Sequence, residues 1–176
     1  MTSRDDGRPR VRLAEAEDLR HLAPIEDSTD PLFRDYFGEE IHPILLSPAE
    51  DGRHRAAMPG FILVAGRPPV GFAHVLLLDG HAHLEEIAVH LGHQRQGIGA
   101  ELVRAAMSEA RAQGFDRLSL CTYRDVPWNG PFYRSLGFTE VAEADYAPYQ
   151  ARLRAKERDL GLDVNGVRVV MSVALR

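Results

Sequence analysis

The sequence predicts a single α/β (α+β) domain with a mixed, mostly antiparallel sheet of about six to seven strands and helices on both faces. One observation is the order of the segments, which is strand, helix, helix, three strands, helix, strand, helix, strand, helix, strand. The other is size, because 176 residues, of which 44% are hydrophobic, suit one core. We therefore expect one domain over residues 11–176 and a flexible, charged tail over residues 1–10.

The N-terminal part predicts a strand, two helical stretches and a loop. Residues 11–27 combine a short strand with a helix whose apolar residues recur near helical spacing. Residues 30–46 form a second helical stretch, which Pro43 is expected to end or kink because proline restricts the residue before it. Residues 47–60 are loop by composition.

Three consecutive antiparallel strands are expected within residues 61–89. Residues 66–69, with the sequence GRPP, make the first turn, and Asp79-Gly80 is a dipeptide typical of the second. Beyond them, six further elements are expected: a helix at 97–114, a strand at 117–123, a short helix at 131–136, a strand at 138–144, a helix at 147–160 and a final strand at 167–175.

The third of these strands, HAHLEEIAV, changes its apolar face partway along. Apolar residues have one parity up to Leu84 and the other parity from Ile87 onward. Because side chains alternate between the faces of a strand, the switch at Glu85-Glu86 predicts a β-bulge there.

Composition and charge exclude several classes of protein. A formal net charge of −5 argues against a nucleic-acid partner. No apolar run approaches the ~20 residues that span a bilayer, and residues 1–10 carry no signal-peptide core, so we expect no membrane partner and a cytoplasmic location. The single cysteine, Cys121, allows no internal disulfide, and its apolar surroundings favour a buried structural thiol over a nucleophile.

Histidines are frequent, but their spacing does not define a metal site. His81 and His83 share one strand face, and His90 and His93 follow. No third ligand is fixed by spacing, and neither a HExxH nor a CxxC motif occurs. The sequence therefore predicts no metal.

A glycine-rich turn, Gln94-x-x-Gly97-x-Gly99, follows a strand and opens a helix. One interpretation is an ordinary loop that needs unusual backbone angles. The other is a phosphate site, because free N–H groups and the helix dipole meet at such a turn. A dinucleotide fingerprint would need a third glycine where Leu102 stands, and no Gly-Lys-Ser/Thr sequence of a Walker A loop is present.

The surroundings of this turn distinguish the two interpretations. The turn, followed by Tyr133-x-x-x-Gly137-Phe138, resembles the GNAT superfamily of acetyl-CoA-dependent N-acetyltransferases over residues 61–138. The resemblance implies a GNAT-like domain whose sheet is bulged and splayed at its fourth strand. It also implies that the turn holds the pyrophosphate of coenzyme A and that the pantetheine arm lies in the splay.

The resemblance further implies which residues hold acetyl-CoA. Backbone groups of Ile87 and Val89 would pair with the pantetheine arm, and the Val89 N–H would polarise the thioester carbonyl. The full expected set is Ile87, Ala88, Val89, Gln94, Arg95, Gln96, Gly97, Ile98, Gly99, Ala100, Asn129, Phe132 and Tyr133.

Three residues are candidates for the chemistry. Tyr133 matches the tyrosine that serves as general acid in many relatives, although it could instead pack its ring against the coenzyme. His83 and Glu85 share a parity and are expected to face the acceptor cleft, where either could be the base, or Glu85 could bind a cationic acceptor. Glu86 is interpreted as a solvated glutamate.

The acceptor pocket is predicted less specifically than the coenzyme site. The residues expected to border it are Phe33, Tyr36, Phe37, His83 and Glu85. The helix at 147–160 lies in a long connection between the last two strands, and it either shapes acceptor choice or covers the sheet edge.

Two functions follow from the resemblance. The first is an acetyl-CoA-dependent N-acetyltransferase that acts on a primary amine of a small molecule, peptide or protein. The alternative is a non-catalytic acyl-CoA-binding or regulatory module on the same fold, which would need neither Tyr133 nor the pair His83 and Glu85. Acyl groups other than acetyl, transfer to oxygen, and a monomer or a homodimer remain open from the residues alone.

Overall fold

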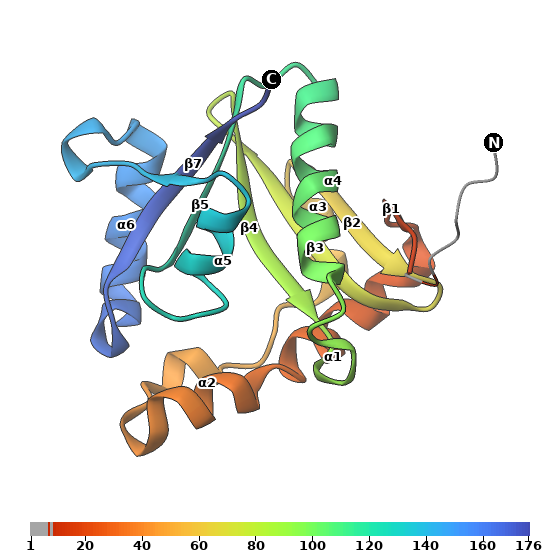
Figure 1. The fold of residues 1–176 in the computed structure, drawn as a ribbon, viewed down its shortest axis with the longest axis horizontal. Coiled ribbons are helices and arrows are strands. Elements are labelled where there is room, and N and C mark those ends of the chain that lie inside the picture. The colour runs from red at the N-terminus through yellow and green to blue at the C-terminus, as the bar shows by residue number, and fades with distance from the viewer. Residues whose placement is uncertain (1–6, 8) are drawn as a thin grey trace.

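The computed structural model describes residues 7 and 9–176, so the tail predicted over residues 1–10 lies mostly outside the described residues. The fold is built on one seven-stranded sheet with the strand order β1-β2-β3-β4-β5-β7-β6 (Figure 1). All of its pairings are antiparallel except that of β4 with β5. The strands are β1 Val11–Leu13, β2 Gly60–Gly66, β3 Pro69–Leu78, β4 His81–Val89, β5 Arg117–Tyr123, β6 Thr139–Glu140 and β7 Arg168–Ala174. The predicted mixed, mostly antiparallel sheet is confirmed.

Six α-helices and six 3₁₀ segments connect the strands within the described part of the chain. The α-helices are α1 Leu22–Asp27, α2 Asp30–Phe37, α3 Gly52–Ala57, α4 Ile98–Ala112, α5 Gly130–Ser135 and α6 Pro148–Asp159. The 3₁₀ segments are η1 Ala16–His21, η2 Gly38–Glu40, η3 Pro43–Leu46, η4 Leu91–His93, η5 Glu143–Asp145 and η6 Leu162–Asn165.

The prediction was wrong for two segments before the sheet. The second helix ends at Phe37 rather than near Pro43, because Gly38 adopts a φ of 66° that breaks the helical path. The segment predicted as loop contains α3, which begins after Asp51, whose carboxylate accepts a hydrogen bond from the Arg53 N–H at 2.7 Å. A local cap therefore starts a helix in a segment whose composition is that of a loop.

Each face of the sheet has its own core. Leu84, Val89 and Leu118 pack with the apolar side of α4 on one face. Val64 and Phe72 pack with α1 on the other face. Because successive residues of a strand point to opposite faces, both cores are built from the same strands, and helices cover both faces as predicted.

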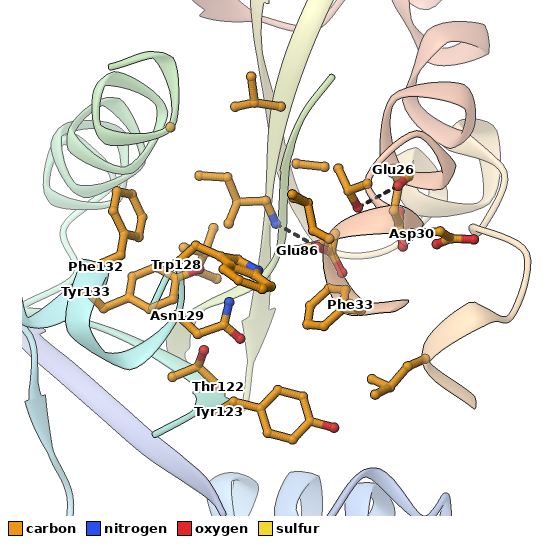
Figure 2. A pocket seen from close by; sticks show the side chains of 18 of the residues that line it. Glu26, Asp30, Phe33, Glu86, Thr122, Tyr123, Trp128, Asn129, Phe132 and Tyr133 are labelled. Carbon is orange, nitrogen blue, oxygen red and sulfur yellow. Dashed lines mark hydrogen bonds between the residues drawn. The ribbon is translucent and has the colours of Figure 1, made fainter. Parts of the chain in front are cut away.

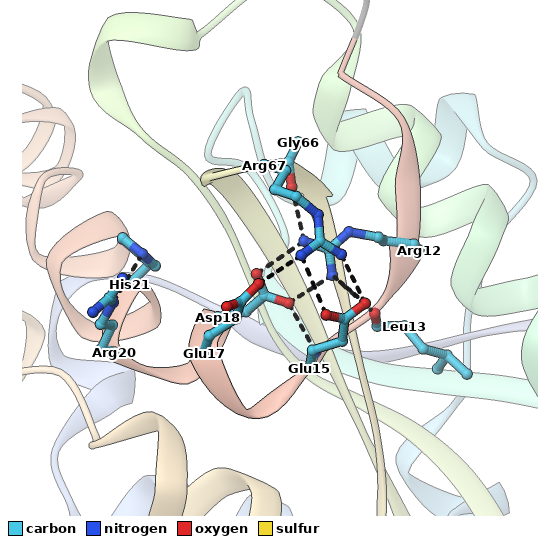
Figure 3. Close-up of polar contacts among 9 residues, drawn as sticks. All are labelled: Arg12, Leu13, Glu15, Glu17, Asp18, Arg20, His21, Gly66 and Arg67. Atoms are coloured by element: carbon cyan, nitrogen blue, oxygen red, sulfur yellow. Dashed lines mark hydrogen bonds and ion pairs between the residues drawn. The ribbon is translucent and has the colours of Figure 1, made fainter.

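A network of ion pairs fastens η1 to the edge of the sheet (Figure 3). The two terminal nitrogens of Arg12 donate to the carboxylate of Asp18 at 2.6 and 2.9 Å, and one of them also reaches the Gly66 carbonyl at 3.2 Å. Asp18 is buried, and the hydrogen bonds from Arg12 lower the pKa of its carboxyl. Arg67 adds an exposed pair with Glu15. The network holds the segment that leads into α1, which borders the cleft described below.

The helix α6 covers the face of the sheet near β5 and is fastened by buried polar groups. Tyr149 and Arg154 are buried, with exposed fractions of 5% and 2%. Arg154 donates two hydrogen bonds to the Asp163 carboxylate and one to Glu157, which also accepts from Arg168 of β7. These contacts make the helix a structural part of the sheet face as well as a neighbour of the cleft.

Candidate active site

The strands β4 and β5 separate after a short pairing. Residues 82–84 of β4 pair with residues 118–120 of β5, and the two strands have no pairing beyond them. The register of β4 on β3 also shifts here, because Val75 is opposite Leu84 while His74 is opposite Glu86. Glu85 is therefore the extra residue of a bulge, and the predicted bulge and splay are confirmed.

The backbone of β4 turns its hydrogen-bonding groups toward this splay. The His90 N–H donates to the Val70 carbonyl at 2.8 Å, which makes Val89 and Gly71 a non-hydrogen-bonded pair of the antiparallel ladder. Such residues direct their N–H and C=O groups away from the partner strand. Val89, and Ile87 two residues earlier, thus point these groups at the gap beside β5.

The glycine turn joins the end of β4 to α4. Gly97 stands at the N-cap of α4 with φ 81° and ψ 1°, a left-handed conformation that glycine adopts readily. Arg95 also has a positive φ, of 59°. The side-chain amide of Gln94 donates to the Val89 carbonyl and ties the turn to the strand. The first N–H groups of a 15-residue helix therefore open beside the splay.

A cleft of about 690 Å³ runs from this turn through the splay to α1 and α2 (Figure 2). All of the residues predicted to hold acetyl-CoA line it except Gln96. Phe33 and Glu85 of the predicted acceptor set also line it, whereas Tyr36, Phe37 and His83 do not. Lining residues that sequence reasoning missed include Glu26, Asp30, Glu86, Tyr123, Trp128 and Arg168.

Tyr133 lies on α5 at the wall of the cleft. Its helix approaches the end of β5 so closely that a Cβ at Gly130 would lie 2.1 Å from the Arg124 carbonyl oxygen, so only glycine fits there. The Tyr133 ring packs against Phe138 with ring centroids 5.7 Å apart. Burial, followed by the negative charge of Glu86, raises the pKa of the phenol. Within residues 7 and 9–176, no group forms a hydrogen bond with its hydroxyl.

His83 is buried beneath α6 instead of facing the cleft. Its Nδ1 lies 2.9 Å from Ser119 Oγ, which lies 2.8 Å from the Tyr149 hydroxyl. Burial lowers the pKa of the imidazole to about 4, so the ring is neutral near pH 7. The expectation that His83 borders the acceptor cleft is corrected, because strand parity fixes the face of a residue but not which helix covers it.

The two glutamates at the bulge lie in different surroundings. The Glu85 side chain is 40% exposed at the cleft, and its Oε2 is 3.9 Å from His83 Nε2. Glu86 was interpreted as a solvated glutamate, but it lies in the cleft wall, where its Oε1 accepts a hydrogen bond from the Ile87 N–H at 3.1 Å. Burial, together with the charge of Glu26, raises the pKa of Glu86 to about 8.

The aromatic residues of α2 form one wall of the acceptor end. Phe33 packs edge-on against Trp128, with ring centroids 5.6 Å apart, and faces the cleft. Tyr36 is 46% exposed and Phe37 packs against Tyr123, so neither lines the cleft as predicted. The spacing i, i+3 and i+4 places the three rings on the same side of α2, but Tyr36 packs on Trp128 and Phe37 packs on Tyr123, so only Phe33 reaches the cleft.

Cys121 contributes a neutral thiol to the cleft wall. It lines the cleft and is partly exposed, so the expectation of a buried structural thiol is corrected. Burial raises the pKa of the thiol to about 12, and the thiolate needed for nucleophilic attack is therefore disfavoured.

The described residues hold neither a cluster of metal ligands nor a helix able to span a membrane. In residues 7 and 9–176, no three His, Cys, Asp or Glu side chains come together as metal ligands could. Across the same part of the chain, the helices lack the combined length and hydropathy of a bilayer span.

Comparison with curated proteins finds partial relatives. A segment of 79 residues is 35% identical to N-acetyltransferase family 8 member 3 of Rattus norvegicus, and the alignment covers 45% of this chain and 34% of that protein. The mouse protein of the same description is 33% identical over 92 residues, covering 52% of this chain and 39% of its own length. The matched segment thus spans little more than a third of these relatives.

Solved structures share the fold over nearly the whole chain. N-acetylglutamate synthase from Neisseria gonorrhoeae, complexed with coenzyme A and N-acetyl-glutamate, has a TM-score of 0.67 at 18% identity and covers 95% of this chain and 35% of its own. PaiA N-acetyltransferase from Thermoplasma acidophilum, in complex with coenzyme A, has a TM-score of 0.65 at 16% identity. The match covers 94% of this chain and 98% of the PaiA chain.

A family model decides the assignment. The model of the Acetyltransferase (GNAT) family matches residues 14–138, which include the bulged strand, the glycine turn and the helix that carries Tyr133. The chain therefore belongs to the GNAT acetyltransferase family.

Proposed function

We propose that the protein is an N-acetyltransferase that moves the acetyl group of acetyl-CoA directly to a primary amine of a small molecule or peptide. The observation that carries the proposal is the direction of the Ile87 and Val89 backbone groups. They face a splay that no strand of the described residues fills and that leads to the glycine turn. Membership of the GNAT acetyltransferase family agrees with it.

The chain's groups fit coenzyme A at both ends of the splay. At the glycine turn, free N–H groups at the start of α4 suit a pyrophosphate, and Gly97 lets the backbone approach it. Along the splay, the Ile87 C=O and the Val89 N–H suit the amides of a pantetheine arm, whereas the Ile87 N–H donates to Glu86 and the Val89 C=O accepts from Gln94. Asn129 and Phe132 border the same groove from α5 and the residue before it.

Acetyl transfer requires a polarised carbonyl, a neutral amine and a proton for the leaving sulfur. The Val89 N–H supplies one donor toward the thioester carbonyl. Tyr133 is protonated at neutral pH and its hydroxyl is free of partners among the described residues, so it supplies the proton for the sulfur. The carboxylates on the other side of β4 accept the proton of the amine.

Two measurements on the purified protein test this function. Calorimetric titration with acetyl-CoA is expected to give saturable binding, and a panel of primary amines is expected to contain one that drives thiol release above the rate without amine. Binding with no amine-dependent thiol release across small amines and peptides would instead support the acyl-CoA-binding regulatory module. Absence of binding would exclude both.

A further inference from the structure

We propose that the acceptor is a small linear molecule with at least two amino groups, and that Asp30 binds the ammonium that does not react. This inference rests on the proposed acetyl transfer and names its substrate class. It follows from carboxylates that lack a cation, from the apolar walls of the cleft, and from the segments that close its acceptor end.

The cleft carries more carboxylates than the chain pairs with cations. Six acidic residues line it, and they are Glu26, Asp27, Asp30, Glu85, Glu86 and Glu157. Arg55 donates to Glu26 at 2.5 Å, and Arg154 and Arg168 both donate to Glu157. Among the described residues, the other four form no ion pair with a lysine or an arginine. A cation brought by the acceptor would therefore meet carboxylates that are still unpaired.

The unpaired carboxylates stand at two separate places. In the view of Figure 2, Tyr133 and Asp30 lie on opposite sides of Glu86. Tyr133 marks the reacting end, because it is 7% exposed and lines the cleft with a hydroxyl that has no partner in the described part of the chain. The negative charge with the largest effect on Glu86 is that of Glu26, whereas for Asp30 it is that of Asp27. An acceptor that reacts beside Tyr133 can thus reach Asp30 with a second group.

Asp30, the first residue of α2, has no cation of its own. Within residues 7 and 9–176, its side chain forms neither an ion pair nor a hydrogen bond. Burial, followed by the charge of Asp27, raises the pKa of its carboxyl, while the exposed Arg34 acts in the other direction without pairing with it. An ammonium at this place would offset both the lost hydration and the repulsion from Asp27.

The walls of the cleft suit a hydrocarbon chain between two ammonium groups. Apolar and aromatic side chains from four segments line it, and they include Phe33, Ile44, Leu45, Trp128 and Leu162. Phe33 and Trp128 pack edge-on, with ring centroids 5.6 Å apart, beside Asp30 in the sequence and the α5 segment. Methylene groups gain from contact with such a wall, and aromatic faces also attract a cation.

The segment that follows α2 closes the acceptor end. The His42 N–H donates to Asn165 Oδ1 at 2.7 Å, and Asn165 Nδ2 donates to the Glu40 carbonyl at 3.0 Å. Asn165 belongs to η6, which borders the cleft at Leu162. The stretch from α2 to η3 is therefore fastened to α1 through the chain and to η6 through these bonds. Such an end admits a narrow, linear molecule more readily than the surface of a folded protein.

Only one amino group of the acceptor takes part in the chemistry. Its lone pair forms the C–N bond as the C–S bond of acetyl-CoA breaks, the sulfur leaves as the free thiol, and one proton is released for each ammonium acetylated. The second ammonium stays charged at Asp30. The product keeps a single cation and is therefore a poor acceptor, so a monoacetylated diamine is expected to accumulate.

The test compares linear terminal diamines of three to eight carbons with the monoamine of the same carbon count at neutral pH. The best diamine is expected to exceed its monoamine in kcat/KM by about 10-fold or more, in the range for a charge-assisted contact. Mass spectrometry is expected to show one acetyl group on the product while unreacted diamine remains.

Three variants assign the preference to Asp30. Asp30→Asn keeps the size of the side chain and is expected to lower the ratio of diamine to monoamine kcat/KM by about 10-fold or more. Asp30→Glu keeps the carboxylate and is expected to retain the preference. Asp35→Asn is the matched control, because Asp35 lies on the same helix, is exposed and does not line the cleft, and its ratio is expected to equal that of the wild type. Calorimetric affinity for acetyl-CoA is expected to be the same in all three.

A preference for diamines that Asp30→Asn abolishes and Asp30→Glu retains supports the proposal. Monoamines that match the diamines, or a basic peptide acetylated faster than every diamine, overturn it and leave the proposed acetyl transfer standing. An Asp30→Asn variant that slows both amines equally also overturns it, because Asp30 would then act only through the fold. A wild type that acetylates no amine or peptide overturns the proposed function and this inference together.

Discussion

The side-chain amide of Gln94 donates a hydrogen bond to the backbone carbonyl of Val89. This bond joins the first residue of the glycine turn to the last residue of β4, across the η4 segment between them. The positive φ of Gly97 and the start of α4 are therefore held at a fixed place relative to the splay. The turn and the backbone groups of Ile87 and Val89 therefore belong to one groove.

The first prediction concerns Gly99 in the turn. A Cβ at this position would lie 3.6 Å from the Phe132 ring, which is ordinary contact, so Gly99→Ala is expected to fold and bind acetyl-CoA. The branched side chain of Gly99→Val would reach further into the groove and is expected to abolish binding in calorimetric titrations. Equal affinities of valine variant and wild type would show that the coenzyme binds elsewhere.

The second prediction concerns the Tyr133 hydroxyl. Tyr133→Phe keeps the ring contacts with Phe132 and Phe138 and removes only the proton donor. Calorimetric affinity for acetyl-CoA is expected to be unchanged, while kcat falls by about 100-fold or more. Tyr36→Phe, at a hydroxyl outside the cleft, serves as the control and is expected to leave kcat unchanged. If the chemical step limits turnover and kcat of Tyr133→Phe is unaltered, the role of Tyr133 is packing and not proton donation.

The third prediction compares two arginines of α6. Arg154 is 2% exposed and donates hydrogen bonds to Asp163 and Glu157. Arg154→Ala removes the cation that these two carboxylates share and is expected to lower the free energy of unfolding by roughly 3 kcal/mol. Arg152 forms a pair with Asp79 whose members are 62% and 59% exposed, and Arg152→Ala is expected to cost less than about 1 kcal/mol. Urea denaturation measures both, and similar losses would contradict the structural role given to Arg154.

The fourth prediction concerns stability below neutral pH. His83 has a pKa of about 4 in the folded protein, below its ordinary value of 6.5, because it is buried. Between these values the unfolded chain binds more protons than the folded one, so this histidine makes stability fall as the pH is lowered from about 6.5 to 4. The effect reaches up to about 3 kcal/mol.

The pH dependence of the wild type alone does not isolate the contribution of His83, because Glu86 changes stability in the opposite direction. A comparison of a His83 variant with the wild type isolates it. The pKa of Glu86 is raised to about 8, so its contribution to stability is lost as the pH rises. His83→Gln keeps a polar group near Ser119 and removes the imidazole. Urea midpoints are expected to fall less in this variant than in the wild type between pH 7 and pH 5. Parallel pH curves would show that His83 titrates normally.

Much of the coenzyme groove was predictable because its signals are local in the chain. The change of parity from Leu84 to Ile87 fixes a bulge whatever packs on the strand, since side chains alternate along any strand. Gly97 needs a left-handed backbone, and a glycine before a helical repeat indicates where such a turn lies. The resemblance to the GNAT superfamily placed the coenzyme residues on these local features and on the segment that carries Tyr133, and nearly all of them line the groove.

The acceptor end was not predictable in the same way, because its residues come from distant segments. Glu26 on α1, Glu86 on β4 and Arg55 on α3 meet only when α1 and α3 pack on one face of the sheet. The sequence by itself determined the faces of β4, the turn and the helix that carries Tyr133. Only the tertiary structure decided that α6 buries His83 while α1 and α2 leave Glu86 in the cleft, because burial depends on which element covers a face and parity does not encode that.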